Sequence, residues 1–206
     1  MKIELEQIGR RFNREWIFRK INYSFHSGKS YAVLGINGSG KSTFLQVISG
    51  SLAPSEGKLS YALADKNIEV EQLFEHLSIA APYLELIEEF TLNELLDFHF
   101  QFKKRIHNLE NEQLILLLNM EANKNKQLKY FSSGMKQRVK LVLAFCSDTP
   151  ILLLDEPTSN LDEQGIQWYK KLVTDFTQNR LTIVCSNQNH EFDFCQEQLF
   201  ITDYKL

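Results

Sequence analysis

Short apolar runs and alternating apolar positions recur along the chain and predict strands. Continuous apolar runs are typical of strands that are buried on both faces of a sheet. Four such runs are present, at 31–34, 77–81, 151–154 and 181–186. Alternating or β-rich stretches predict further strands at 3–8, 15–25, 58–62 and 199–202. Strand material therefore lies towards both ends of the sequence.

Helical patterns separate the strands, and they dominate the middle of the chain. They predict helices at 43–49, 91–104, 112–120, 132–145 and 162–176. Thr91 and Glu94 have the spacing of a capping box, which marks a helix start. The polar stretch 122–129 is expected to be a loop. Because 83–148 is mostly helical and an α/β pattern resumes after it, we expect one α/β domain, 1–206, with a helical insertion.

Composition describes an ordinary globular protein and excludes several classes of partner. The 206 residues carry a net charge of −3, which gives no support to broad binding of nucleic acid. Cys146, Cys185 and Cys195 lack metal-ligand spacing, so reduced structural thiols of a cytosolic protein are expected. The N-terminus does not resemble a signal peptide, and the longest apolar runs are far too short to span a bilayer. We therefore expect a soluble, cytoplasmic chain that reaches a membrane only through a partner.

The segment from Gly35 to Ser42 fits the phosphate-binding pattern G-x-x-x-x-G-K-[ST]. It stands between a predicted strand and a predicted helix, which is the context that the motif requires. Glycines let backbone N–H groups approach phosphate oxygens, and the following helix adds its positive dipole end. Lys41 is expected to reach the β- and γ-phosphates, and the Ser42 hydroxyl to ligate Mg²⁺. The remaining nucleotide-binding candidates of this segment are Asn37, Gly38, Ser39, Gly40 and Thr43.

Two carboxylates, Asp155 and Glu156, end the apolar run 151–154. An aspartate at the carboxyl end of a buried strand beside a phosphate loop can hold Mg²⁺ directly or through water. The next carboxylate can polarise a water molecule for attack on the γ-phosphate. Acidic residues that merely cap the following segment are the alternative, and the phosphate loop favours the catalytic interpretation.

A third motif, from Phe131 to Arg138, identifies a family. Alone it is a serine-capped helix start, which is also a possible anion site. Together with Asp155-Glu-Pro157 it resembles the signature of the ATP-binding subunit of ABC transporters, usually written L-S-G-G-Q-x-Q-R, at the family's usual spacing. The segment 159–162 resembles the D-loop of that family. The resemblance covers nearly the whole chain, and the compact length is similar to the small subunits of haem-exporter type.

The resemblance implies roles for further residues. Ser132 and Gly134 would contact the γ-phosphate of ATP held on the opposite subunit. Asp162 would lie at the dimer interface near the partner's phosphate loop. Phe12 matches the aromatic residue that stacks on adenine, Trp16 is its rival, and a core role is the alternative for either residue.

The signature and one loop depart from the family pattern. Ser133 and Met135 replace the first glycine and the glutamine of the signature, and a β-carbon at 133 hinders close approach to a phosphate. The family has a glutamine near the end of the 77–81 strand. Here Pro82 or Tyr83 stands at that position, because 80–90 contains no glutamine.

The family also has a histidine after the 181–186 strand, where it touches the γ-phosphate. An ungapped alignment puts Asn187 there, with Gln188 as the alternative register. His190 comes a few residues late and is favoured as an ordinary loop histidine over a displaced ligand. An asparagine can donate a hydrogen bond but cannot carry a proton as histidine does. We therefore expect hydrolysis that is not abolished but is open to being slow, with Glu156, Lys41 and Asn187 as the catalytic residues.

The resemblance implies a P-loop NTPase fold of ABC type, with a mixed-sheet α/β core, an N-terminal antiparallel β portion and a helical insertion. It implies an ATP hydrolase that binds ATP and Mg²⁺ and forms a head-to-tail homodimer, or a heterodimer with a related subunit. A separate transmembrane permease would hold it on the inner face of the membrane and turn closure into substrate movement. The alternative is a slow ATP-dependent switch or clamp without transport. A small-molecule kinase is disfavoured, since it has no use for the signature.

Overall fold

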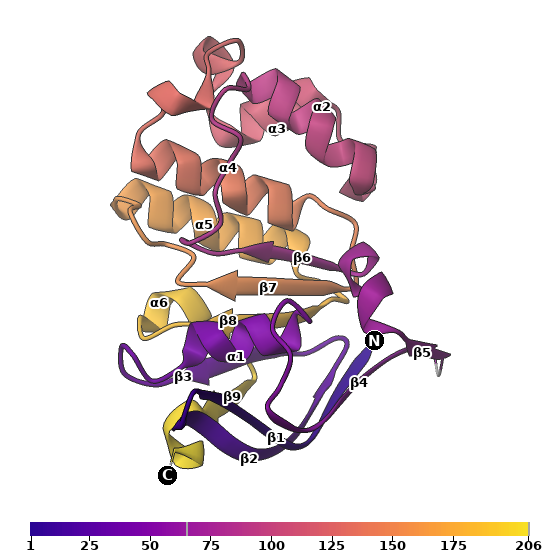
Figure 1. The fold of residues 1–206 in the computed structure, drawn as a ribbon. Coiled ribbons are helices and arrows are strands. Elements are labelled where there is room, and N and C mark those ends of the chain that lie inside the picture. The colour runs from indigo at the N-terminus through magenta and orange to yellow at the C-terminus, as the bar shows by residue number, and fades with distance from the viewer. Residues whose placement is uncertain (65, 206) are drawn as a thin grey trace.

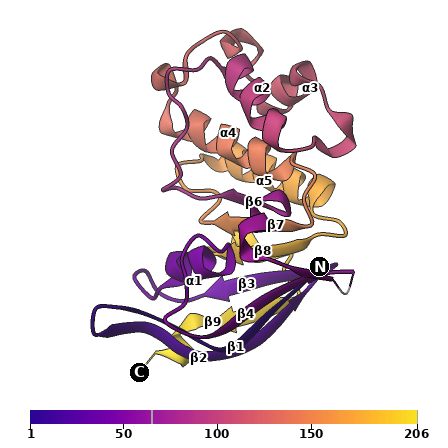
Figure 2. The same ribbon diagram turned by 45° about the vertical axis from the view of Figure 1, so that its right-hand side comes forward.

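The computed structural model describes residues 1–64 and 66–205 and contains two sheets (Figure 1). One is a five-stranded parallel sheet, and the other is a four-stranded antiparallel sheet near the N-terminus. Helices cover the parallel sheet on the side away from the antiparallel sheet, as two views agree (Figures 1 and 2). This arrangement confirms the predicted α/β class with an N-terminal antiparallel portion and inserted helices.

The parallel sheet has the order β6-β7-β8-β3-β9. Its strands are β3 (Ser30–Leu34), β6 (Leu77–Ala80), β7 (Ile151–Asp155), β8 (Leu181–Cys185) and β9 (Glu197–Phe200). In register, Asp155 at the end of β7 lies opposite Cys185, and Val33 of β3 lies opposite Cys185 on the other side. Because parallel strands end at the same edge, the loops after β7, β8 and β3 meet there.

Alternate residues of the central strands pack into two different cores. In β7, Leu152 and Leu154 face the helices, whereas Ile151 and Leu153 face the antiparallel sheet. This follows from the two-residue period of a strand. The helical side contains α4 (Ser133–Phe145) and α5 (Glu163–Phe176). The opposite side contains α1 (Lys41–Ile48), whose Phe44 and Leu45 are fully buried.

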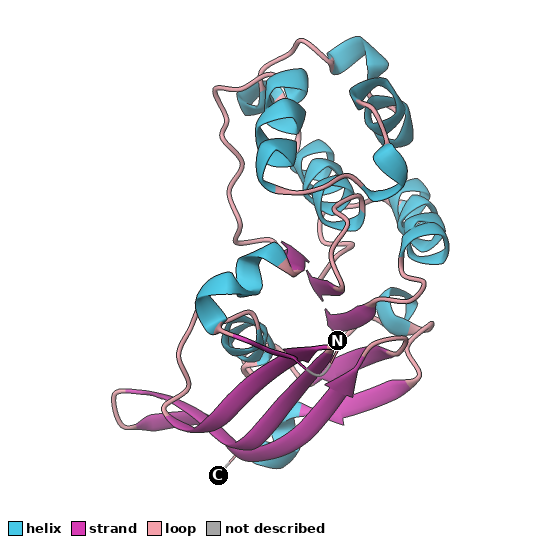
Figure 3. Ribbon diagram, turned by 90° about the vertical axis from the view of Figure 1, so that its right-hand side faces the viewer, coloured by secondary structure: helices cyan, strands magenta, loops and turns pink. Residues whose placement is uncertain are grey.

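The antiparallel sheet lies at the end of the molecule opposite the inserted helices (Figure 3), and its strand order is β2-β1-β4-β5. Its strands are β1 (Lys2–Phe12), β2 (Glu15–His26), β4 (Glu56–Leu63) and β5 (Lys66–Ile68). Ile3, Leu5 and Ile8 of β1 are buried, as the alternating pattern predicted. The aromatic rings of Phe18 and Phe44 meet edge to face with centroids 5.6 Å apart, which ties β2 to α1.

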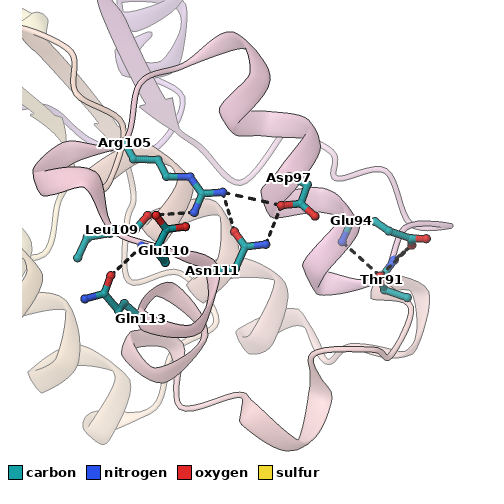
Figure 4. A network of polar contacts seen from close by, with 8 residues as sticks. All are labelled: Thr91, Glu94, Asp97, Arg105, Leu109, Glu110, Asn111 and Gln113. Carbon is teal, nitrogen blue, oxygen red and sulfur yellow. Dashed lines mark hydrogen bonds and ion pairs between the residues drawn. The ribbon is translucent and has the colours of Figure 1, made fainter.

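The helices between β6 and β7 are α2 (Leu92–Phe102), α3 (Asn111–Leu118) and α4. The capping box of α2 is present, since Thr91 Oγ1 accepts from the Glu94 backbone N–H and the Glu94 carboxylate accepts from the Thr91 N–H (Figure 4). Arg105, which follows α2, donates to Asn111 Oδ1 at the start of α3, and Asn111 donates to Asp97 in the middle of α2. The exact bounds of the helical subdomain, 83–148, stay a prediction.

Some predicted elements differ from the structure. The last strand was expected at 199–202, but β9 spans Glu197–Phe200 and a 3₁₀ turn follows at Ile201–Tyr204. The sequence pattern does not predict β5, a 3₁₀ helix at Val70–Glu75 or the short helix α6 (Asn189–Phe192). Each missed element is short, and none has enough residues to show a periodic pattern. In the part of the chain that the structure describes, no helix has the length and apolar character needed to cross a bilayer.

Candidate nucleotide site

The phosphate loop connects β3 to α1, as its motif requires. Gly38 and Gly40 have φ angles of 74° and 104°, a region that favours glycine, and Gly40 also lies against Ile17 of β2. The Lys41 ammonium is buried and donates to the Gly35 carbonyl at 2.8 Å and the Ile36 carbonyl at 3.4 Å. The backbone of the loop therefore accepts hydrogen bonds from the Lys41 ammonium, which lies beside the backbone atoms that would bind phosphate.

A pocket of about 240 Å³ opens at this loop. Its lining residues are Ile17, Asn37, Gly38, Gly40, Lys41, Ser42, Thr43 and Glu156. Of the predicted site residues, the structure thus brings the lysine, the Mg²⁺ hydroxyl and the candidate catalytic glutamate to one cavity. Ile17 belongs to it through its position on β2, and sequence reasoning missed it because nothing in β2 marks one apolar residue as a lining residue.

Asp155 is buried at the end of β7, beside the pocket. Neither of its carboxylate oxygens has a hydrogen-bond partner among the described residues. Burial raises the pKa of Asp155 to about 6, and the nearby Ser42 hydroxyl and Lys41 ammonium oppose that rise. Two buried acceptors without donors, next to a hydroxyl, are the donor set that suits a hard divalent cation. Ser42 and Asp155 therefore fit Mg²⁺.

Glu156 follows Asp155 with a φ angle of 42°, unusual for a residue with a side chain. Its backbone N–H donates to the Cys185 carbonyl at 2.9 Å, which fixes the first residue after β7 against the end of β8. The left-handed backbone turns the chain sharply at this point. The turn separates the directions of two neighbouring carboxylates, so that Asp155 is buried while Glu156 lines the pocket.

Asn187, two residues after β8, also contacts the phosphate loop. Asn187 Nδ2 donates to Asn37 Oδ1 at 2.7 Å. Gln188 instead uses its backbone N–H, which donates to Ser186 Oγ. His190 Nε2 lies 3.0 Å from Thr158 Oγ1, and His190 is not among the residues that line the pocket. Of the three candidates for the missing histidine, only Asn187 contacts the phosphate loop through its side chain.

The signature segment opens α4 on a different pocket, of about 350 Å³. Ser132 is exposed, and its Oγ caps the helix by accepting from the Met135 N–H at 3.3 Å. A β-carbon on Gly134 would lie 2.9 Å from the Asn160 carbonyl oxygen, so the close packing of the first turn of α4 against the loop at Asn160 requires glycine. Asp162 lines the same pocket and caps α5 by accepting from the Gly165 N–H at 2.8 Å. No described residue lines both pockets.

Neither candidate for adenine stacking belongs to the two hydrophobic cores of the described residues. Phe12 is 46% exposed, with the Arg10 guanidinium 4.5 Å from its ring centroid. Trp16 is partly buried, with the Arg19 guanidinium 4.4 Å from its ring. Phe12 is the more accessible of the two rings. The choice between them stays a prediction.

Tyr83 stands near the position where the resemblance expects a glutamine. Partial burial and the nearby Asp155 carboxylate raise the pKa of its hydroxyl. Pro82, the other candidate, contributes only its carbonyl oxygen, which accepts from Lys140 Nζ at 2.9 Å.

Two buried polar residues that sequence reasoning did not single out, Gln137 and Glu191, contact the loop after Glu156. Gln137 is 2% exposed and Glu191 is fully buried. Gln137 lies within the signature motif, so the sequence already marked its segment as part of a candidate site. For Glu191 the sequence carries no signal, because one glutamate in the polar stretch before β9 looks like a surface residue.

Comparison with protein families decides the identity. The family model described as "ABC transporter" matches residues 18–159 of the chain. The chain belongs to the ABC transporter family. As an ABC transporter ATP-binding subunit it is an ATP hydrolase coupled to transport, which confirms the predicted family and activity. The likeness to subunits of haem-exporter type stays a prediction.

Relatives of this ABC subunit are similar along most of its length. It is 28% identical over 195 residues to the ABC transporter ATP-binding protein YybJ of Bacillus subtilis (strain 168), covering 92% of this chain and 86% of YybJ. It is 26% identical to ATP-binding cassette sub-family A member 7 of Rattus norvegicus over 88% of this chain, which is 8% of that much longer protein.

Solved structures show the same fold. An ABC transporter ATP-binding protein of Pyrococcus furiosus superposes with a TM-score of 0.82 at 18% identity, with 100% of both chains covered. A dimeric bacterial ABC transporter cassette superposes with a TM-score of 0.75 at 21% identity, covering 97% of this chain and 95% of the cassette. At these identities the likeness carries the fold alone.

Proposed function

We propose that two copies of this chain close head to tail around two Mg-ATP, each nucleotide lying between the phosphate loop of one copy and the signature of the other. The separation of the two pockets carries the proposal. Ser132 and Gly134 share a pocket with Asp162 and contribute nothing to the pocket of Lys41 within the same chain. A second copy can complete both sites at once only in a head-to-tail arrangement. A related subunit could replace the second copy in a heterodimer.

Within each site the proposed roles follow from the geometry. Lys41 holds the β- and γ-phosphates by charge-assisted hydrogen bonds. Ser42 and Asp155 would hold Mg²⁺, which when bound neutralises phosphate charge. Glu156 polarises the attacking water. Asn187 donates to the γ-phosphate or to that water, exchanging its present acceptor, Asn37 Oδ1.

We further propose that a separate permease in the membrane binds this subunit and holds it on the inner, cytoplasmic face. A groove of about 440 Å³ supports this proposal, because it begins beside Tyr83 and is lined mostly by apolar side chains. Phe74 and Tyr83 at this groove are 57% and 41% exposed. The groove includes Gln46 of α1, the helix that follows the phosphate loop, and an exposed apolar groove suits a partner segment.

One observation keeps a second candidate open, a slow ATP-dependent switch without transport. Residues 80–90 contain no glutamine, and Asn187 stands where the family has the histidine that touches the γ-phosphate. Losing one well-aimed donor costs about 10²–10³ in rate. Recovery of a membrane-spanning partner after gentle solubilisation supports the transporter, whereas repeated recovery of only non-membrane partners supports the switch.

Sedimentation velocity of a Glu156→Gln variant tests the head-to-tail dimer. This substitution leaves the binding residues in place while removing the group that polarises water. With Mg-ATP we expect the dimer to dominate at micromolar concentration, and with Mg-ADP the monomer. Glu163→Gln, on the first turn of α5 and outside the pocket, is the matched control and should behave as the unmodified chain. An ATP-loaded Glu156→Gln chain that stays monomeric at high concentration argues against the proposal.

A further inference from the structure

One peptide group in the loop after Glu156 is held at both ends by buried side chains. The peptide joins Pro157 to Thr158. Gln137 Nε2 donates to the Pro157 carbonyl at 2.8 Å, and the Thr158 N–H donates to Glu191 Oε1 at 2.7 Å. Gln137, Thr158 and Glu191 are 2%, 5% and 0% exposed. Water is therefore no substitute partner for this peptide, and breaking either contact leaves a buried group unpaired.

Glu191 is surrounded by donors. Besides the Thr158 N–H, its carboxylate accepts from the hydroxyls of Thr158 and Ser186. The backbone carbonyl of Glu191 also accepts a hydrogen bond from the Tyr169 hydroxyl at 2.8 Å, a contact that does not involve the carboxylate. Because both carboxylate oxygens have partners, the Glu191 side chain holds the peptide and the end of β8 together.

The three elements joined at this peptide each lead to a different part of the candidate site. Gln137 lies on α4, one helical turn after Gly134 of the signature. Glu191 lies on α6, four residues after Asn187. The peptide begins one residue after Glu156. A second contact runs alongside, since Gly134 packs against the Asn160 carbonyl of the same loop.

We infer that Gln137 and Glu191 are positioning residues that hold the Pro157–Thr158 peptide and thereby set the place of Glu156 against the nucleotide. Through them, a movement of the signature helix on dimer closure reaches Glu156 and Asn187 along buried hydrogen bonds. The inference rests on the proposed role of Glu156. It adds a link within one subunit between the signature and the hydrolytic end of the phosphate pocket.

The test compares ATP binding with single-turnover hydrolysis in Gln137→Met, Glu191→Gln and the double variant. Both single variants keep side-chain volume, and neither residue lines the phosphate pocket. We expect each to slow hydrolysis by about 10-fold or more while the Kd for Mg-ATP changes less than about twofold, because small misplacements reduce rate more than binding. The double variant should lose little beyond the worse single variant, since both act on one peptide.

Two controls separate positioning from general loosening. Tyr169→Phe removes a buried hydrogen bond of α6 without touching the peptide, and its hydrolysis rate should stay within about twofold of the unmodified chain. Thr158→Ser keeps the N–H and the hydroxyl, so it should retain the rate. If Glu191→Gln does not fold, the hydrolysis rates of Gln137→Met and Tyr169→Phe still test the inference, because Gln137 lies on α4 and not on α6.

The inference is overturned if Gln137→Met and Glu191→Gln hydrolyse ATP at the unmodified rate, if their losses multiply in the double variant, or if Tyr169→Phe loses as much as they do. Glu156→Gln is measured beside them. If Glu156→Gln itself hydrolyses normally, the proposed function fails as well. If it is inactive while the positioning variants are fully active, only the inference fails.

Discussion

Asn187 at the end of the β8 region donates a 2.7 Å hydrogen bond to Asn37 of the phosphate loop. The contact joins residues that are 150 positions apart in the sequence. It arises because β8 and β3 are neighbours in the parallel sheet and end at the same edge. The amide of Asn187 therefore already lies beside the loop that would hold the phosphates.

Replacing Asn187 should slow hydrolysis without weakening ATP binding. We expect Asn187→Ala to reduce the single-turnover rate by about 10²-fold or less, because one donor to the transition state is lost. The Kd for ATP should change little if the contact strengthens mainly in the transition state. Gln188→Ala is the matched control, since that side chain is exposed and forms no side-chain hydrogen bond. A rate loss confined to His190→Ala would show that His190, and not Asn187, takes the role of the family's histidine in hydrolysis.

Ser132 and Thr91 offer a comparison between a helix cap and a nucleotide contact. Each caps a helix with its hydroxyl, so Ser132→Ala and Thr91→Ala should each lower the free energy of unfolding by about 1 kcal/mol. In a domain of this size that lowers Tm by about 2–4 °C. In the Glu156→Gln background, only Ser132→Ala should also weaken the ATP-dependent dimer in sedimentation. If Ser132→Ala and Thr91→Ala dimerise equally with ATP, Ser132 caps its helix and makes no contact with the nucleotide.

The stability of the chain should depend on pH through His99. Its Nε2 lies 3.0 Å from Ser147 Oγ, whose own proton goes to the Leu143 carbonyl, so Nε2 carries the donated hydrogen. Burial, with a smaller contribution from Lys103, lowers the pKa of His99 to about 4. Between pH 6.5 and 4 the unfolded chain binds a proton that the folded chain does not, so stability falls as pH falls through this range.

Denaturant unfolding of the unmodified chain and of His99→Gln measures this effect. The stability difference between the two should shrink by up to about 3 kcal/mol from pH 7 to pH 4. Taking the difference is necessary, because the raised pKa of Asp155 acts with the opposite sign over an overlapping range. A difference that does not change with pH would mean that His99 is as easily protonated in the folded chain as in the unfolded one.

The sequence was sufficient wherever a local pattern and a chemical motif agreed. The apolar run before Asp155 predicted a buried strand, and Gly35–Ser42 predicted a strand-to-helix phosphate loop between β3 and α1. Since all strands of a parallel sheet end at the same edge, the meeting of Lys41 after β3 with Glu156 after β7 could also be expected. Thr91 and Glu94 predicted the start of α2 from two residues alone.

Contacts between distant buried polar groups could not be predicted in this way. Glu191 and Gln137 meet one peptide only because α6 and α4 pack on either side of it, and no periodic pattern encodes that geometry. Arg180 is another example, since its buried guanidinium donates to the Phe145 carbonyl at the end of α4 and to Thr149 Oγ1. In sequence it is one arginine before a strand. Tertiary packing decides such roles, and a single sequence does not display it.

Mixing two inactive variants tests the central claim most directly. Lys41→Ala removes the phosphate-binding cation of one chain, and Ser132→Arg blocks the exposed signature serine of the other. Each alone should have almost no ATPase activity. In a head-to-tail mixed dimer, the intact phosphate loop of the Ser132→Arg chain meets the intact signature of the Lys41→Ala chain. One complete site is restored, so activity should rise well above the sum of the two variants. Folded variants whose mixture stays as inactive as its components would contradict the account.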